Sequence, residues 1–143
     1  MIHNNAMITI EGQQWGADEE PQAIRLTTEG QLYKKNDSWL VAYDESEATG
    51  LDGTRTTIRV DSDGTVTLLR SGSHEMEMIF VQGSRHITNM VTPYGNLAIG
   101  IYTTRAQSTL GADGGSIHLG YSIDFNQQET ATQKLDLEIR LKG

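Results

Sequence analysis

Apolar and polar residues alternate at every second position along most of this chain, and that period is typical of β-strands. The stretch 134–142 shows the pattern most clearly. Its apolar residues fall on one face, Leu135, Leu137, Ile139 and Leu141, and its charged residues fall on the other, Lys134, Asp136, Glu138, Arg140 and Lys142. An α-helix repeats about every 3.6 residues and cannot separate the two kinds in this way. The pattern therefore predicts a strand with one buried face.

The same alternation predicts about ten strand segments and no helical stretch of useful length. They follow one another at 7–11, 24–35, 38–45, 54–60, 65–70, 75–81, 85–92, 96–107, 117–125 and 134–142. Turn-forming residues separate them, for example Asn36-Asp37 and Asp61-Ser62-Asp63-Gly64. Gln82-Gly83-Ser84 is expected to join 75–81 and 85–92 as a hairpin. Short strands joined by tight turns are typical of a meander.

We therefore predict an all-β fold, an antiparallel up-and-down β-barrel of about eight to ten strands. Closing the sheet pairs the edge strands that an open sheet leaves exposed. The long segments 24–35 and 96–107 are expected to bend, each pairing with more than one neighbour. A β-sandwich is the alternative, but it needs more long crossover connections than the sequence shows. The length indicates a single domain over 1–143, with a flexible tail at 1–6.

Composition narrows the classes of function. The chain has 143 residues and no cysteine, which excludes disulfides, thiolate metal sites and cysteine nucleophiles. Its formal net charge of -8 repels phosphate backbones, so we do not expect nucleic-acid binding. No apolar stretch reaches the length of a membrane-spanning helix, and the first residues do not resemble a secretory signal. We expect a cytoplasmic protein that binds neither nucleic acid nor membrane.

Several motifs, in a defined order, carry a resemblance to a known family. They are Tyr43-Asp44-Glu45-Ser46-Glu47, Leu69-Arg70-Ser71-Gly72, Met76-Glu77-Met78-Ile79-Phe80, Thr92-Pro93-Tyr94-Gly95, Asn96-Leu97-Ala98-Ile99-Gly100-Ile101-Tyr102-Thr103 and Gly115-Ser116-Ile117-His118-Leu119-Gly120-Tyr121. In order and spacing the chain resembles the YwiB-like family of uncharacterised bacterial β-barrel proteins over most of its length. The resemblance implies a lipocalin-like (calycin-type) barrel. It implies no assigned activity and supplies no catalytic residues.

Three polar residues are predicted to face the barrel interior at the same end of neighbouring strands: Glu45, Thr56 and Arg70. Each shares strand parity with apolar residues, and in a meander the end of one strand lies beside the start of the next. One interpretation is structural, an ion pair between Arg70 and Glu45 bridged by the Thr56 hydroxyl, because an unpaired buried charge is costly. The other is functional: Arg70 binds a ligand carboxylate or phosphate, assisted by Tyr43.

An apolar stripe formed by Met76, Met78 and Phe80 is predicted to face the same interior. Two interpretations stay open, a packed core and a cavity for an apolar ligand, since methionine adapts to irregular contents. Barrels of about eight strands are either filled by side chains or hold one small ligand. The candidate ligand-binding residues are therefore Tyr43, Glu45, Thr56, Arg70, Met76, Met78 and Phe80.

The sequence predicts no catalytic residue, no metal site and no cofactor. The four histidines, His3, His74, His86 and His118, are not spaced as metal ligands on one strand face. Ser73 and His74 are adjacent, so on a strand they point to opposite faces and cannot form a triad. No phosphate loop or dinucleotide fingerprint is present. An enzyme is thus the least favoured class.

The favoured function is binding without catalysis, with a small apolar or amphipathic anion held inside the barrel or at its mouth. The alternative is a structural protein, a scaffold with a filled core that interacts with another protein. Three tyrosines predicted to face outward, Tyr33, Tyr94 and Tyr102, either pack across strands or form the surface of a homodimer.

Overall fold

The computed structural model is built almost entirely of β-strands. It describes residues 4–16, 20–73, 75–92, 94–125 and 128–142. The strands are β1 (Ala6–Gly16), β2 (Gln22–Lys35), β3 (Ser38–Asp44), β4 (Thr54–Val60), β5 (Val66–Gly72), β6 (Met76–Phe80), β7 (Arg85–Thr92), β8 (Gly95–Ser108), β9 (Gly114–Phe125) and β10 (Gln128–Leu141). One 3₁₀ helix, η1 (Glu47–Thr49), lies between β3 and β4. Each predicted segment corresponds to one of these strands, and the all-β prediction is confirmed.

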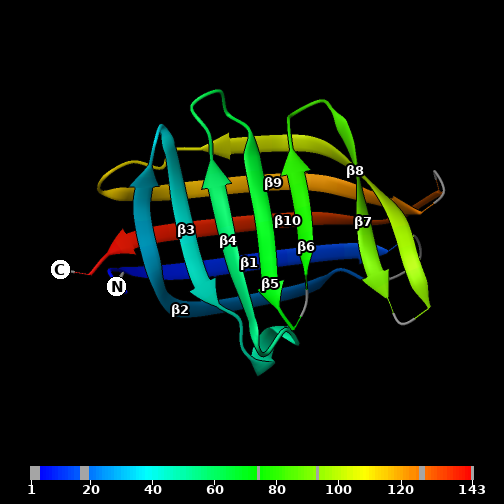
Figure 1. Cartoon of the computed structure of the whole chain (residues 1–143), viewed down its shortest axis with the longest axis horizontal. Coiled ribbons are helices and arrows are strands. Elements are labelled where there is room, and N and C mark those ends of the chain that lie inside the picture. The colour runs from blue at the N-terminus through cyan, green and yellow to red at the C-terminus, as the bar shows by residue number, and fades with distance from the viewer. Residues whose placement is uncertain (1–3, 17–19, 74, 93, 126–127, 143) are drawn as a thin grey trace.

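The strands pair antiparallel with their neighbours in the order β6-β5-β4-β3-β2-β1-β10-β9-β8-β7. Every neighbour in this order is also a neighbour along the chain, except that β1 pairs with β10. Figure 1 shows β3 to β6 crossing steeply in front of β1, β9 and β10, so that the curled sheet encloses one interior. This order confirms the predicted up-and-down barrel.

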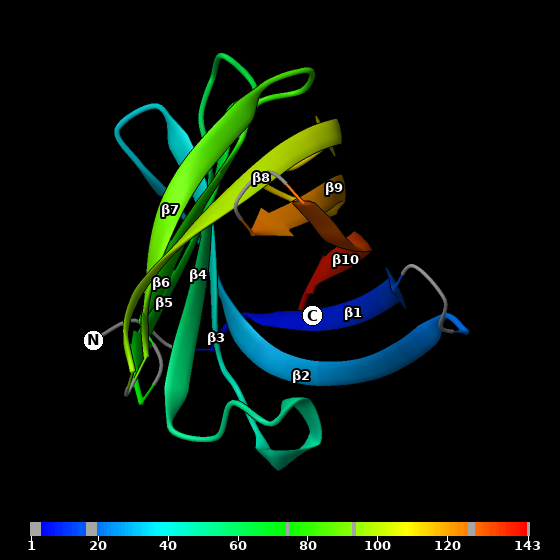
Figure 2. The same cartoon turned by 90° about the vertical axis from the view of Figure 1, so that its right-hand side faces the viewer.

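The strand β2 bends and serves two neighbours, as predicted for the long segments. Residues 22–30 pair with β1, and residues 31–35 pair with β3. Gly30 stands at this corner, where a Cβ atom would collide with the Ile8 side chain and the Ala42 carbonyl oxygen. A glycine therefore allows the two halves of the barrel to approach there. Figure 2 shows the resulting curve of β2 beneath the barrel.

The barrel is nearly closed, and its seam lies between β6 and β7. Among the described residues no ladder joins these two strands, so the expected hairpin between them is not formed. The Thr88 hydroxyl instead donates to the Glu77 carbonyl oxygen at 2.6 Å. The connecting turn is anchored on β8, where the Gly83 N–H donates to the Thr103 carbonyl oxygen at 2.8 Å. The seam is thus held by a side-chain bond and a turn rather than by paired strands.

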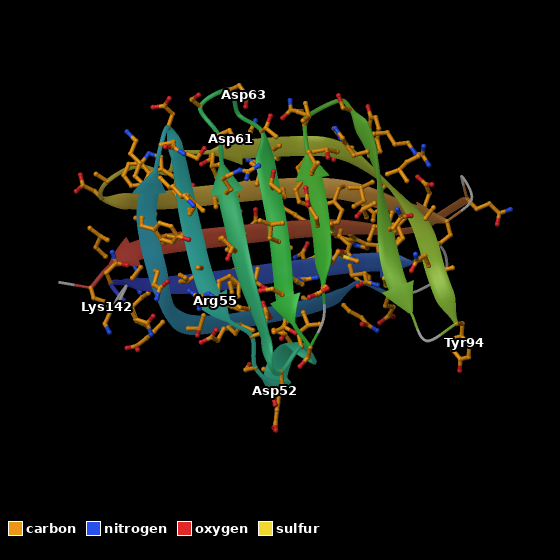
Figure 3. The ribbon with its side chains drawn as sticks, viewed as in Figure 1. Asp52, Arg55, Asp61, Asp63, Tyr94 and Lys142 are labelled. Carbon is orange, nitrogen blue, oxygen red and sulfur yellow. The ribbon has the colours of Figure 1, made fainter. Side chains whose placement is uncertain are left out.

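The two ends of the strands β3, β4 and β5 carry different loops. Figure 3 shows Asp61 and Asp63, in the turn between β4 and β5, at one end, and Asp52, in the connection between β3 and β4, at the other. We call the second end, where η1 also lies, the mouth. The C-terminal end of β3, the start of β4 and the end of β5 meet there.

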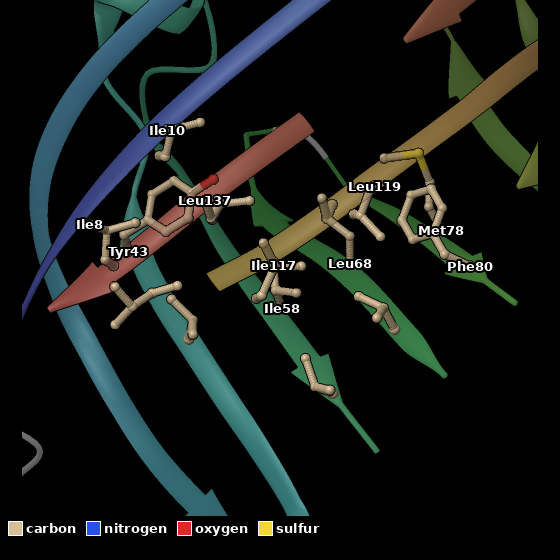
Figure 4. Close-up of a cluster of buried hydrophobic side chains, with 14 of the residues drawn as sticks. Ile8, Ile10, Tyr43, Ile58, Leu68, Met78, Phe80, Ile117, Leu119 and Leu137 are labelled. Atoms are coloured by element: carbon tan, nitrogen blue, oxygen red, sulfur yellow. The ribbon is translucent and has the colours of Figure 1, made fainter. Parts of the chain in front are cut away.

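Side chains fill the middle of the barrel. The largest fully buried ones include Phe80, Ile58, Leu68, Ile117 and Leu119, which come from both halves of the sheet. Figure 4 shows these residues interleaving between opposite walls. The Phe80 ring contacts the Tyr121 ring at a centroid distance of 4.8 Å. Between the two ends, the barrel is therefore a packed core.

The N-terminal residues that the structure describes are anchored to the barrel. Ala6 is the first residue of β1 and is fully buried. The Asn5 side chain donates to the Leu32 carbonyl oxygen at 2.9 Å and accepts from the Leu32 N–H at 2.8 Å. Asn5 and Ala6, which the strand pattern had assigned to a flexible tail at 1–6, are thus a bonded and a buried residue of the barrel. Residues 1–3 lie outside the described residues.

Candidate functional site

The polar residues predicted to converge at the mouth lie in one row across the sheet. Tyr43 on β3 is the cross-strand partner of Thr56 on β4, and Thr56 is in turn the partner of Arg70 on β5. Met76 on β6 extends the row as the partner of Arg70. Directly opposite residues share a face, so these side chains all point into the barrel. Tyr43 and Thr56 are fully enclosed there.

Glu45 follows β3 and reaches the same row. Its backbone N–H donates to the Thr54 carbonyl oxygen at 2.8 Å, which continues the strand pairing by one step. The Thr56 hydroxyl donates to Glu45 Oε1 at 3.1 Å. Burial raises the pKa of the Tyr43 phenol, and the nearby negative charge of Glu45 raises that pKa further. The mouth therefore holds Tyr43 as a neutral hydroxyl beside a carboxylate.

Arg70 is the unusual member of the row. Its Nε is buried and has no hydrogen-bond partner among the described residues. The ion pairs between described residues do not include one between Arg70 and Glu45. The positive charge of Arg70 nevertheless opposes the rise in pKa of two phenols, those of Tyr43 and Tyr121, so the guanidinium group lies near both. The Arg70–Glu45 ion pair of the structural interpretation is not formed.

A cleft of about 450 Å³ opens beside these groups, and we call it the mouth cleft. Its charged lining residues are Glu45, Arg70 and Lys134, and Tyr43 and Tyr121 also line it. Its apolar lining comes from Ile10, Ile24, Leu26, Leu51 and Leu135. The cleft thus joins a polar floor to an apolar wall, a combination typical of small-molecule sites.

Tyr121 on β9 belongs to the cleft and was not among the predicted site residues. Its hydroxyl donates to Gln133 Oε1 at 2.6 Å, and Gln133 Nε2 donates to Gln14 Oε1 at 3.3 Å. Burial raises the pKa of Tyr121 to about 12. Tyr121 shares strand parity with the buried residues Ile117 and Leu119, but no sequence signal gave its height along the barrel relative to Arg70.

The apolar stripe lies mainly in the core. Met78 and Phe80 are buried within the central cluster, and Met76 is partly buried against it. None of the three lines the mouth cleft. Thr56 does not line the cleft either, but its hydroxyl donates a hydrogen bond to Glu45, which does. The cleft therefore brings together Tyr43, Glu45 and Arg70 from the predicted set.

A larger cavity of about 620 Å³ lies on the outer face of β8, β9, β10 and β1. His118 Nδ1 lies 2.6 Å from Asp136 Oδ1, and Lys134 Nζ lies 3.8 Å from Asp136 Oδ2. These charged groups are already partners of one another. The described lining of this outer cavity does not include Arg70, whose enclosed Nε faces the mouth end of the barrel without a described acceptor.

In the part of the chain that the structure describes, no group of three or more His, Asp or Glu side chains is arranged to hold a metal ion. Within the same residues, no helix has the length and apolar character needed to cross a membrane.

Comparisons with known proteins place this barrel in a family. The family described as Domain of unknown function (DUF1934) matches residues 8–137. The chain is 28% identical over 129 residues to the uncharacterized beta-barrel protein YwiB of Bacillus subtilis (strain 168), an alignment covering 90% of this chain and 83% of that protein. The crystal structure of the ywiB protein from Bacillus subtilis superposes with a TM-score of 0.78 at 24% identity, covering 94% of this chain and 91% of that one. The family resemblance seen in the sequence is thereby confirmed, and the chain belongs to the DUF1934 family of β-barrel proteins of unknown function.

Proposed function

We propose that this protein is a non-enzymatic binding protein that holds a small amphipathic anion in the mouth cleft, with the anionic group on Arg70. The observation that carries the proposal is the buried Nε of Arg70, which has no partner among the described residues. Buried polar atoms in proteins are almost always hydrogen-bonded, and this Nε is enclosed although the Arg70 side chain as a whole is only partly buried. A ligand carboxylate would supply the missing acceptor.

The apolar wall supports an amphipathic ligand over a simple inorganic anion. Ile24, Leu26 and Leu51 line the cleft beside the charged floor, and part of Ile24 is exposed to solvent. Covering such side chains with an alkyl chain contributes roughly 25 cal/mol per Å² of apolar surface. The cleft volume of 450 Å³ lies within the range of small-molecule sites and equals about fifteen water volumes. A ligand with a short alkyl chain and one anionic end fits this space.

A scaffold function is the second candidate, and the filled interior favours it. Phe80, Ile58 and Leu68 leave no room for a ligand in the middle of the barrel. Under this alternative Arg70 is a structural residue that water satisfies. The binding function predicts that removing the guanidinium group weakens ligand binding, whereas the scaffold function predicts no such effect.

The test is isothermal titration of decanoate into the wild-type protein and two variants. Arg70→Gln removes the charge at the cleft floor. Arg55→Gln is the matched control, because Arg55 lies on the outer face and is bonded to Asp44 and Gln31. We expect Arg70→Gln to weaken decanoate binding by about 10- to 100-fold, the range for a lost hydrogen bond between charged groups. Arg55→Gln should leave the affinity within about twofold of wild type.

Neutral decanol of the same chain length separates the charge from the tail. It should bind more weakly than decanoate and should not respond to Arg70→Gln. Absence of decanoate binding to the folded wild-type protein, or equal affinities for wild type and Arg70→Gln, would overturn the binding function and leave the scaffold. Native mass spectrometry of the purified protein tests independently for a co-purified ligand in the same mass range.

A further inference from the structure

Two opposite charges, Glu45 and Arg70, line the mouth cleft without forming an ion pair among the described residues. Thr56 stands between them: it is the cross-strand partner of Arg70, and its hydroxyl donates to Glu45. Both charges act on the same phenol, that of Tyr43. Glu45 and Arg70 are therefore close neighbours, and each lines the cleft without being bonded to the other.

The pair of opposite charges limits which functional groups the ligand can carry more strongly than Arg70 alone does. A bare carboxylate bound to Arg70 would lie near the formal negative charge of Glu45 and be repelled by it. Glu45 Oε1 accepts from Thr56, and the Tyr43 hydroxyl also shares a hydrogen bond with the Glu45 carboxylate. A carboxylate can accept about four hydrogen bonds, so Glu45 retains capacity for another donor. A hydrogen-bond donor placed beside the ligand carboxylate would relieve the repulsion and use that capacity. The polar floor thus presents a donor and an acceptor side by side.

We propose that the ligand is an apolar carboxylic acid with a hydrogen-bond donor on the carbon next to the carboxylate, that is, a 2-hydroxy or 2-amino acid. This inference rests on the proposed function and specifies its ligand class; it includes 2-amino acids, which are zwitterions, because they keep the carboxylate that Arg70 binds. The carboxylate accepts from Arg70, the hydroxyl or ammonium group donates to Glu45, and the side chain of the acid lies on the wall that Ile24, Leu26 and Leu51 form. Glu45 is then the residue that determines specificity.

The experiment compares three ligands of equal chain length: decanoate, 2-hydroxydecanoate and 2-aminodecanoate. The proteins are wild type, Glu45→Gln and Glu47→Gln. Glutamine at 45 keeps an acceptor for Thr56 and removes the negative charge, whereas Glu47 is an exposed residue of η1 outside the lining of the cleft. Affinities are measured by isothermal titration, and circular dichroism verifies that each variant retains its strand signal.

In wild type we expect 2-hydroxydecanoate to bind about tenfold more tightly than decanoate, since a hydrogen bond to a charged group is among the stronger ones. Because the ammonium group adds charge pairing, 2-aminodecanoate should bind at least as tightly as 2-hydroxydecanoate. Decanoate should bind to Glu45→Gln more tightly than to wild type. In this variant the affinity for 2-hydroxydecanoate should exceed the affinity for decanoate by about threefold or less. Glu47→Gln should reproduce the wild-type ratios.

Two results would overturn this ligand class. One is equal binding of decanoate and 2-hydroxydecanoate to wild type, which can be decided without any variant. The other is an unchanged ratio in folded Glu45→Gln. If either occurs while Arg70→Gln still weakens decanoate, the proposed binding function stands and only the ligand class fails. If no ligand of the three binds, both fail together.

Discussion

Four arginines on the outer face of the barrel wall lie within 3.3 Å of a carboxylate, whereas Arg70 on the inner face has no carboxylate partner among the described residues. The outer pairs are Arg25–Glu11, Arg55–Asp44, Arg59–Asp61 and Arg85–Asp124. Figure 3 shows Arg55 near the mouth end of this wall and Asp61 in the turn at its opposite end. Exposed pairs of this kind contribute little to stability, with a median of about 0–1 kcal/mol. The charged residues on the outer face thus form ion pairs where such pairs contribute least to stability.

The inner arginine is unpaired even though a carboxylate lies nearby. Glu45 is bonded to Thr56 at 3.1 Å and does not form an ion pair with Arg70. Arg70 is partly buried, and its enclosed Nε has no acceptor among the described residues, which is unfavourable for stability. The proposed binding function accounts for this contrast, because a ligand would be the external partner of the guanidinium group. Three changes test how far the inner and outer faces differ.

The largest difference is expected between two apolar residues, Phe80 inside and Ile87 outside. Phe80 is 0% exposed and contacts Tyr121, whereas Ile87 on β7 is 65% exposed. Phe80→Ala should lower the free energy of unfolding by about 3–5 kcal/mol, because it removes buried surface and leaves a cavity. Ile87→Ala should change that free energy by about 0.5 kcal/mol or less. Urea unfolding followed by circular dichroism measures both, and similar losses would contradict the packed interior.

Local alternation was sufficient to predict the inward row at the mouth. Glu45, Thr56 and Arg70 were predicted to lie together from strand parity and meander order. In the structure the ladder pairs Thr56 with Arg70 and with Tyr43, and Glu45 is bonded to Thr56. Both signals are short-range, since each hairpin fixes its register through its own turn. The bend of β2 was likewise visible as a segment too long for one neighbour, with Gly30 at the corner.

Contacts across the barrel could not be predicted in the same way. Tyr121 and Lys134 reach the mouth cleft from β9 and β10, which have no ladder with β5. Their height relative to Arg70 depends on strand tilt and on how the seam closes, and no pair of sequence neighbours records either. The hydrogen bond from Thr56 to Glu45 also depends on side-chain geometry, which the strand pattern does not record. The sequence therefore predicted two of the three charged residues that line the cleft, Glu45 and Arg70, and left their pairing open.

A smaller effect is expected from the buried phenol of Tyr121 at alkaline pH. Burial raises its pKa to about 12 in the folded protein, against 10.0 when unperturbed. Between these values the unfolded chain loses the proton first, so the unfolded state binds fewer protons and stability falls as the pH rises. Stability is fully present below pH 10, and roughly 2–3 kcal/mol should be lost by about pH 12 from this group.

The check is urea unfolding between pH 8 and pH 11.5 for wild type and Tyr121→Phe. The variant should lose a small amount of stability at pH 8, where the bond to Gln133 is removed, and should then show a shallower alkaline decline than wild type. The pKa of Tyr43 is also raised by burial, so part of the decline should persist in the variant. Identical alkaline slopes for the two proteins would contradict an enclosed phenol at the mouth.

The smallest expected change in the free energy of unfolding comes from replacing an inner or an outer arginine by methionine. The two replacements should change this free energy in opposite directions. Arg70→Met removes a charge that has no described partner and keeps most of the apolar volume, so the free energy of unfolding should rise by about 1 kcal/mol. Arg85→Met removes two hydrogen bonds to Asp124, at 2.7 and 3.0 Å, and its urea midpoint should fall. Urea midpoints in ligand-free protein decide the comparison. A fall for Arg70→Met comparable to that for Arg85→Met would mean that Arg70 has a structural partner and that the inner face is not organised for a ligand.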